Sequence, residues 1–144
     1  MFSDIVVGTD GSETAGAALG AAIDLARTHG ATLHVVSAYK PAAASTAMMA
    51  AGATVAGDDG VRQALAQDAT EKVLNDAVRQ AEGIEVTTHT AGGPPADVLV
   101  AVAEDVGADL IVVGSKGMQR RVLGSVPNTV SHRAPCNVLI VKTT

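Results

Sequence analysis

Residues 112–125, VVGSKGMQRRVLGS, decide how the rest of the sequence is interpreted. An apolar, strand-like run ends at Gly114, and a segment with two more glycines separates it from a helix-like segment that begins at Ser125. Glycine has no Cβ, so backbone N–H groups beside it can approach a ligand that a side chain would block. The first turn of a helix adds unpaired N–H donors and a partial positive charge. The stretch therefore predicts a site for a small anion such as a phosphate group.

The charge of this stretch supports an anion site. Three of the ten cationic residues fall within it, Lys116, Arg120 and Arg121, although the formal net charge of the chain is -5. A local positive pocket in an acidic protein attracts a small anion. The spacing of the glycines alone also fits an ordinary turn between a strand and a helix with a solvated basic loop. The position of the stretch in the fold is therefore needed to distinguish a ligand site from such a turn.

Strand-like runs alternate with helix-like segments along the whole chain. We expect strands at residues 4–9, 31–39, 84–91, 108–113 and 136–142, and helices at 12–30, 61–82, 95–106 and 125–133. Alternation with right-handed crossovers builds a parallel sheet with helices on both faces. The sequence thus predicts an α/β fold with a single doubly wound five-stranded parallel sheet, for which we take the strand order 3-2-1-4-5. One domain is expected over residues 1–144, with the strand at 84–91 at a sheet edge.

The middle of the chain predicts a loop followed by an amphipathic helix. Residues 41–60 are rich in Ala, Gly, Ser and Thr with little periodicity, which is typical of a surface loop. From residue 61 the helical pattern returns, with apolar side chains at Val61, Leu65, Ala69, Val73 and Ala77.

The predicted sheet places the glycine-rich stretch where a ligand binds. In a doubly wound sheet, ligands bind outside the carboxyl ends of the strands, where the strand order reverses. For the order 3-2-1-4-5 this point lies between the first and fourth strands, whose following loops are residues 8–12 (GTDGS) and the stretch from Gly114. Asp10 is expected to accept from a ribose hydroxyl or to hold a divalent cation, with an Asx turn or a helix cap as the alternative. The location favours a ligand over an ordinary turn.

The composition disfavours several classes of protein. One Phe, one Tyr and no Trp leave no aromatic platform for stacking bases, and the acidic net charge disfavours binding to nucleic acid. No run approaches the roughly 20 apolar residues that span a bilayer, and the N-terminus lacks the features of a signal peptide. We therefore expect a cytoplasmic protein with no nucleic acid and no membrane among its partners. Cys136 is the only cysteine and predicts a buried structural thiol.

Signatures of nucleotide enzymes and of catalysis are missing from the sequence. There is no GxxxxGK followed by Ser or Thr, and no GxGxxG, so a P-loop NTPase and a Rossmann dehydrogenase are disfavoured. The four histidines, His29, His34, His89 and His132, show no ligand spacing, and no Ser/His/Asp set can be assembled. Without a general base or an activated nucleophile, turnover is expected to be slow at most.

Three segments resemble the universal stress protein family. They are IVVGTDGS near the start, GSKG after the predicted fourth strand and LGSVPNTVSHRAPCNVLIV near the end, and the resemblance covers essentially the whole chain. It implies a five-stranded α/β fold of the adenine nucleotide alpha hydrolase-like type and a homodimer formed through the C-terminal strand. It also implies a place in the branch that binds ATP or a related adenine nucleotide.

The resemblance also implies a set of nucleotide-binding residues. The matching positions are Gly8, Thr9, Asp10, Val35, Gly114, Ser115, Lys116, Gly117, Arg120, Arg121, Gly124, Ser125 and Val126. In this set Gly8 and Asp10 lie near adenine and ribose, Asp10 being the candidate ligand of an accompanying Mg²⁺, and Val35 offers backbone to the adenine edge. Gly124 and Ser125 open the phosphate-facing helix. The spacer 118–123 is shorter than the usual one of the family, so the sequence favours an adenine nucleotide without selecting ATP.

Two other functions remain open from the sequence. A dimeric interaction protein with no nucleotide is the first, and a protein whose ligand is cyclic AMP is the second. A hydrolase of a small phosphorylated substrate is disfavoured because no catalytic set is present. The apolar terminal strand CNVLIVK independently favours a homodimer, because an exposed strand edge pairs readily with its own copy.

Overall fold

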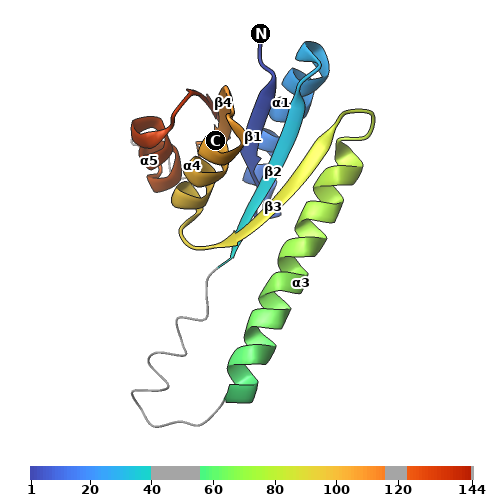
Figure 1. Ribbon diagram of the computed structural model, residues 1–144, viewed down its shortest axis with the longest axis vertical. Helices are drawn as coiled ribbons and strands as arrows, with labels where there is room; N and C mark the ends of the chain where they lie inside the picture. The colour runs from blue at the N-terminus through green and yellow to red at the C-terminus, as the bar shows by residue number, and fades with distance from the viewer. Residues whose placement is uncertain (40–55, 116–122, 144) are drawn as a thin grey trace.

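The computed structural model describes residues 1–39, 56–115 and 123–143. Its elements, in chain order, are β1 (Asp4–Gly8), α1 (Glu13–His29), β2 (Thr32–Tyr39), α3 (Ala56–Gln80), β3 (Val86–Gly92), α4 (Pro95–Val106), β4 (Leu110–Gly114), α5 (Ser125–Arg133) and β5 (Asn137–Val141) (Figure 1). All neighbouring strands pair in parallel, in the order β3-β2-β1-β4-β5. The predicted α/β class, the strand order and the edge position of β3 are confirmed.

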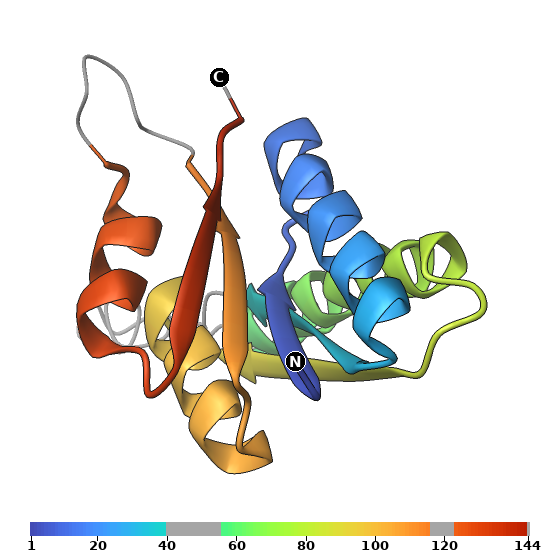
Figure 2. The ribbon, with the colours of Figure 1, turned by 90° about the horizontal axis from the view of Figure 1, so that it is seen from above.

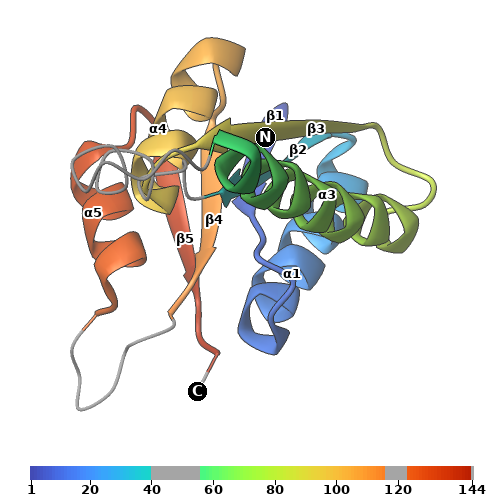
Figure 3. The same ribbon diagram turned by 90° about the horizontal axis from the view of Figure 1, so that it is seen from below.

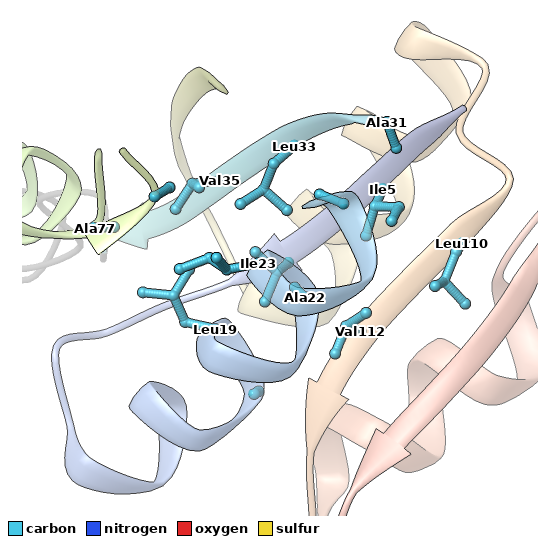
Figure 4. Close-up of a cluster of buried hydrophobic side chains, with 14 of the residues drawn as sticks. Ile5, Leu19, Ala22, Ile23, Ala31, Leu33, Val35, Ala77, Leu110 and Val112 are labelled. Carbon is cyan, nitrogen blue, oxygen red and sulfur yellow. The ribbon is translucent and has the colours of Figure 1, made fainter. Parts of the chain in front are cut away.

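Helices cover both faces of the sheet, with α1 and α3 on one face and α4 and α5 on the other (Figures 2 and 3). Successive strand residues point to opposite faces, so Val6 and Val7 of β1 belong to two different cores. Figure 4 shows the core under α1 and α3, in which Leu33 and Val35 of β2 pack near Leu19. The central strands are buried on both sides, which explains why they are almost continuously apolar.

The ends of α1 and α4 are formed by residues that favour helix termini. The hydroxyl oxygen of Ser12 accepts a hydrogen bond from the backbone N–H of Ala15 (3.2 Å), which satisfies one donor of the first turn of α1. At the other end Gly30 adopts a left-handed conformation with φ 65° and donates its N–H to Ala26. Pro95 is the first residue of α4, where a missing N–H costs nothing.

Helix α3 differs from the sequence prediction in two ways. It begins at Ala56, so the last five residues of the predicted loop 41–60 are helical, whereas residues 40–55 lie outside the described part of the chain. The predicted apolar stripe is buried only toward its C-terminal end, because Val61 is 58% exposed and Leu65 is 62% exposed, whereas Leu74 and Ala77 are buried.

The lengths of the two neighbouring elements explain the exposed stripe. With 25 residues, α3 is roughly 38 Å long, whereas the seven residues of β3 span roughly 23 Å. The N-terminal half of the helix therefore projects past the sheet, as Figure 1 shows. Within the described ranges, no helix combines the length and the apolar composition needed to cross a membrane.

Candidate functional site

A cavity of about 460 Å³ opens at the carboxyl ends of β1 and β4, where the strand order reverses. Its wall is formed by Gly8, Thr9, Asp10, Ser12, Thr14, Ala15, Val36, Ala38, Pro95, Leu99, Val113, Gly114, Gly124, Ser125, Val126 and Pro127. The volume lies within the range of roughly 300–1,000 Å³ that small-molecule sites occupy. The apolar side chains come mainly from β2, α4 and α5, and the polar side chains come from the turn after β1 and from the first residues of α1 and α5. The cavity therefore has the location and the mixed lining expected of a ligand site.

The turn after β1 is fixed by its own hydrogen bonds. Thr9 donates its backbone N–H to Val36 (2.9 Å), and its hydroxyl oxygen accepts from the N–H of Gly11 (3.3 Å). Gly11 has φ +80°, which a residue with a Cβ adopts only with strain. The Oδ1 atom of Asp10 accepts from the N–H of Ser12 (2.9 Å), which is the Asx contact that the sequence offered as the alternative role of this residue. The contact places the carboxylate of Asp10 at the cavity wall.

The helix that follows β4 faces the cavity with an uncapped N-terminus. Gly124 is the N-cap of α5 and provides no side-chain acceptor, so Ser125 is the first helical residue and does not cap its own turn. The backbone N–H groups of Ser125 and Val126 have no acceptor within the helix, and Pro127 has no N–H to satisfy. Gly124, Ser125 and Val126 all line the cavity. The positive end of the helix dipole is therefore directed at the same space.

Gly114 and Ser115 have structural roles that the sequence did not predict. Gly114 does not adopt a positive φ, and a Cβ there would lie 3.2 Å from Cγ2 of Thr143 and 3.5 Å from the carbonyl oxygen of Thr14. Ser115 is fully buried and absent from the cavity wall. Its hydroxyl oxygen accepts from the N–H of Thr143 (2.9 Å), and its own N–H donates to Val141 (2.9 Å). These contacts fasten the end of β4 to the C-terminal strand.

The side chain of Val35 does not line the cavity, and the alternation of the strand explains why. The predicted contact of its backbone with the adenine edge stays a prediction. The Val35 side chain is fully buried in the core under α1 and α3, on the opposite face of the sheet. The next residues along one face, Val36 and Ala38, line the cavity instead. Val36 lies opposite Gly8 in the register of β1 and β2, and this pairing is the signal that would have selected it.

The structure brings together seven of the thirteen predicted site residues. Gly8, Thr9, Asp10, Gly114, Gly124, Ser125 and Val126 line the cavity. Lys116, Gly117, Arg120 and Arg121 lie outside the described residues. Sequence reasoning missed most of the apolar wall, which includes the buried side chains of Val36 and Leu99, because these residues come from segments without any motif.

The described residues contain neither a metal cluster nor an activated thiol. Within residues 1–39, 56–115 and 123–143, no group of three or more His, Cys, Asp or Glu side chains is placed to hold a metal ion. Cys136 is half-buried just before β5 rather than fully buried as predicted. Burial, together with the nearby charge of Asp109, raises the pKa of its thiol, so the thiolate needed for nucleophilic chemistry is disfavoured.

The doubly wound five-stranded sheet with a ligand-sized cavity at its switch point defines the class of the protein, an open α/β domain. The sequence profile of the Universal stress protein family matches residues 1–142, and the chain belongs to this family. A universal stress protein of Mycobacterium tuberculosis is 37% identical over 150 residues, covering 99% of this chain and 98% of the relative.

Two solved structures extend the comparison to ligands. A universal stress protein in complex with cAMP is 33% identical, with a TM-score of 0.69 and coverage of 99% of this chain and 98% of that one. A universal stress protein from Archaeoglobus fulgidus in complex with dAMP is 25% identical, with a TM-score of 0.62 and coverage of 97% and 98%.

Proposed function

We propose that this universal stress protein binds an adenine nucleotide in the cavity between β1, β4 and α5 and acts through binding, in a regulatory role, rather than by turnover. The observation that carries the proposal is the uncapped N-terminus of α5, which faces an apolar cavity of ligand size. Unpaired backbone donors and the helix dipole favour a phosphate, while the apolar wall favours a flat aromatic base. The relatives bound to cAMP and dAMP support the same class of ligand.

Each part of the nucleotide has a matching part of the wall. The purine would contact Val36, Ala38 and Leu99, whose side chains form the apolar side. The ribose would lie against the turn after β1, where Asp10 offers a carboxylate oxygen. The first phosphate would accept from the backbone N–H groups of Ser125 and Val126.

We propose bound Mg²⁺ only where the ion is also coordinated by the phosphates of the nucleotide. Asp10 is the acidic side chain on the cavity wall, and the described residues hold no cluster of three metal-ligating side chains. Mg²⁺ retains most of its waters and is usually held by one or two carboxylates plus substrate phosphates. Asp10 therefore fits a Mg²⁺ that arrives with ADP or ATP, and it does not fit a site built by the protein alone.

Thermal denaturation with a nucleotide panel tests the proposal. AMP, cyclic AMP, dAMP, ADP and ATP, the last two with and without Mg²⁺, are compared with GMP and with Mg²⁺ alone. At about a hundred times its dissociation constant, a ligand stabilises the native state by about 2.7 kcal/mol. We expect that shift for at least one adenine nucleotide and none for Mg²⁺ alone. No shift with any adenine nucleotide would favour the interaction protein without a nucleotide.

We further propose a homodimer that forms through β5. This strand is the sheet edge next to β4, and it is apolar although half-buried or exposed along its whole length, with Leu139 37% exposed. Unpaired N–H and C=O groups along such an edge invite pairing with a second strand.

Sedimentation at micromolar concentration tests the dimer. The unchanged chain is expected to sediment as a dimer, whereas Leu139→Lys is expected to shift it to monomer because a lysine on a strand edge opposes pairing. Leu65→Lys, on the exposed half of α3, is the matched control and should remain dimeric. A monomeric unchanged chain would contradict the proposal.

A further inference from the structure

Three titratable side chains form a continuous hydrogen-bonded row across the sheet, away from the cavity. Nε2 of His34 lies 3.0 Å from Oδ1 of Asp4, and Nδ1 of the same ring lies 3.0 Å from Nε2 of His89. We call Asp4, His34 and His89 the histidine chain. It joins β1, β2 and β3, and it includes two of the four histidines in which the sequence alone showed no pattern.

Strand register places these residues together. Asp4 lies opposite Thr32, so His34 is two residues further along β2 and on the same face. His34 in turn lies opposite Thr87, and His89 is two residues further along β3. The three side chains therefore follow a diagonal on the face covered by α4. His34 is only 7% exposed, so water contributes little to satisfying its ring.

The hydrogen bonds define which ring nitrogens of the histidine chain carry protons when both imidazoles are neutral. A carboxylate can only accept, so Nε2 of His34 carries a proton and donates it to Asp4. Nδ1 of a neutral His34 is then an acceptor, and Nε2 of His89 must donate to it. The remaining nitrogen, Nδ1 of His89, is left as the place where the first additional proton can bind without breaking either hydrogen bond.

A second additional proton cannot be accommodated in this geometry. It must bind to Nδ1 of His34, the atom that accepts the hydrogen bond from His89. Both ring nitrogens would then carry hydrogens directed into the same 3.0 Å gap. The two rings, whose centroids are 5.2 Å apart, would also both be positively charged. Double protonation therefore breaks the side-chain hydrogen bond between His34 of β2 and His89 of β3.

We propose that the histidine chain is a pH-sensitive switch: it holds the edge strand β3 on the sheet while the two imidazoles carry at most one additional proton, and it releases β3 when both are charged. β3 is suited to local release because it is an edge strand, paired in the described structure only with β2. Edge elements with few buried side chains open at lower cost than the central strands.

The charges around the histidine chain determine in which direction a change of pH releases β3. Burial lowers the pKa of His89 below its usual value of 6.5, the neighbouring His34 lowers it further, and Asp105 on α4 acts in the opposite direction. Asp4 is the carboxylate on β1, and Asp109, before β4, accepts from the backbone N–H groups of Ser3 and Asp4. A lowered pKa means that the unfolded state binds the proton more readily. The folded chain therefore resists charging of His89, and the doubly charged state that releases β3 is reached only as the pH falls below about 6.5.

Ring-nitrogen NMR on the unchanged chain tests the proposal directly. At about pH 8 we expect both His34 and His89 as Nε2–H tautomers, and on acidification two coupled titration steps rather than two independent single-site curves. The protection factors of the β3 amides are expected to fall at least about tenfold over the same pH range, while those of β1 and β4 stay constant. Independent single-site titrations, or constant protection in β3, would overturn the proposal.

A substitution of His89 can remove the titration of its ring while it keeps a hydrogen-bond donor to Nδ1 of His34. His89→Gln retains an amide donor at the place of Nε2 and removes the titratable ring, so β3 is expected to remain protected at low pH. His132→Gln, an exposed histidine in the last turn of α5, is the matched control and should behave as the unchanged chain does. An unaltered pH response in His89→Gln would contradict the switch, and loss of both titrations on adding micromolar Zn²⁺ would make the pair a metal site instead. If His89→Gln does not fold, the ring titration of the unchanged chain decides alone.

Discussion

Leu33→Ala is expected to lower the free energy of unfolding by about 2–5 kcal/mol, whereas the same substitution at Leu65 should change it by less than about 0.5 kcal/mol. Leu33 is fully buried in β2, between the edge strand and β1, and packs in the core under α1 and α3 (Figure 4). Its truncation removes apolar contacts and leaves a cavity that the surrounding strands cannot close. Leu65 lies on the half of α3 that projects past the sheet.

Urea denaturation of the two variants under identical conditions measures this difference. The two substitutions remove the same atoms, so the comparison isolates the environment of each side chain. Since a domain of this kind is stable by only about 5–15 kcal/mol, the loss at Leu33 is a large fraction of the total. A loss of several kcal/mol at Leu65 would show that the exposed half of α3 is covered in solution.

Ser125→Glu is expected to weaken adenine nucleotide binding at least about tenfold, a loss of about 1.4 kcal/mol. The new carboxylate would stand at the first residue of α5, on the wall where the phosphate is proposed to bind, and like charges repel. At the same time a negative charge at a helix N-terminus stabilises the helix by about 0.3–1 kcal/mol. The substitution should therefore reduce affinity without reducing stability, a combination that general unfolding cannot produce.

Calorimetric titration with the nucleotide selected by the panel measures the affinity, and thermal denaturation without ligand measures the stability. Ser131→Glu is the matched control because it introduces the same charge on the exposed C-terminal half of the same helix. It should leave the affinity unchanged. Equal affinity in Ser125→Glu and the unchanged chain would mean that the phosphate does not approach α5.

Sequence reasoning identified those cavity residues that stand at a strand end or at a helix start, because such positions can be recognised from neighbouring residues alone. Gly8 and Asp10 end one strand and Gly124 opens a helix, and in a doubly wound sheet these ends meet at one place. Sequence reasoning did not identify Val36, because one step along a strand reverses the face and only the pairing with β1 shows which side chains of β2 face the cavity. Ser115 shows the same limit, since its partner Thr143 lies 28 positions away in the sequence.

The alternation of apolar strands with amphipathic helices determined the fold class, because burial requirements and turn chemistry act along short stretches of chain. The sequence also marked the two loops that meet at the cavity. Only the tertiary structure decided that Val61 and Leu65 of α3 are exposed, that Ser115 is buried away from the cavity, and that Asp4, His34 and His89 form one hydrogen-bonded chain. These outcomes depend on strand register and on where the sheet ends. Strand register and the extent of the sheet are both set by packing between segments that are distant in sequence, so they cannot be predicted from any short stretch of the chain.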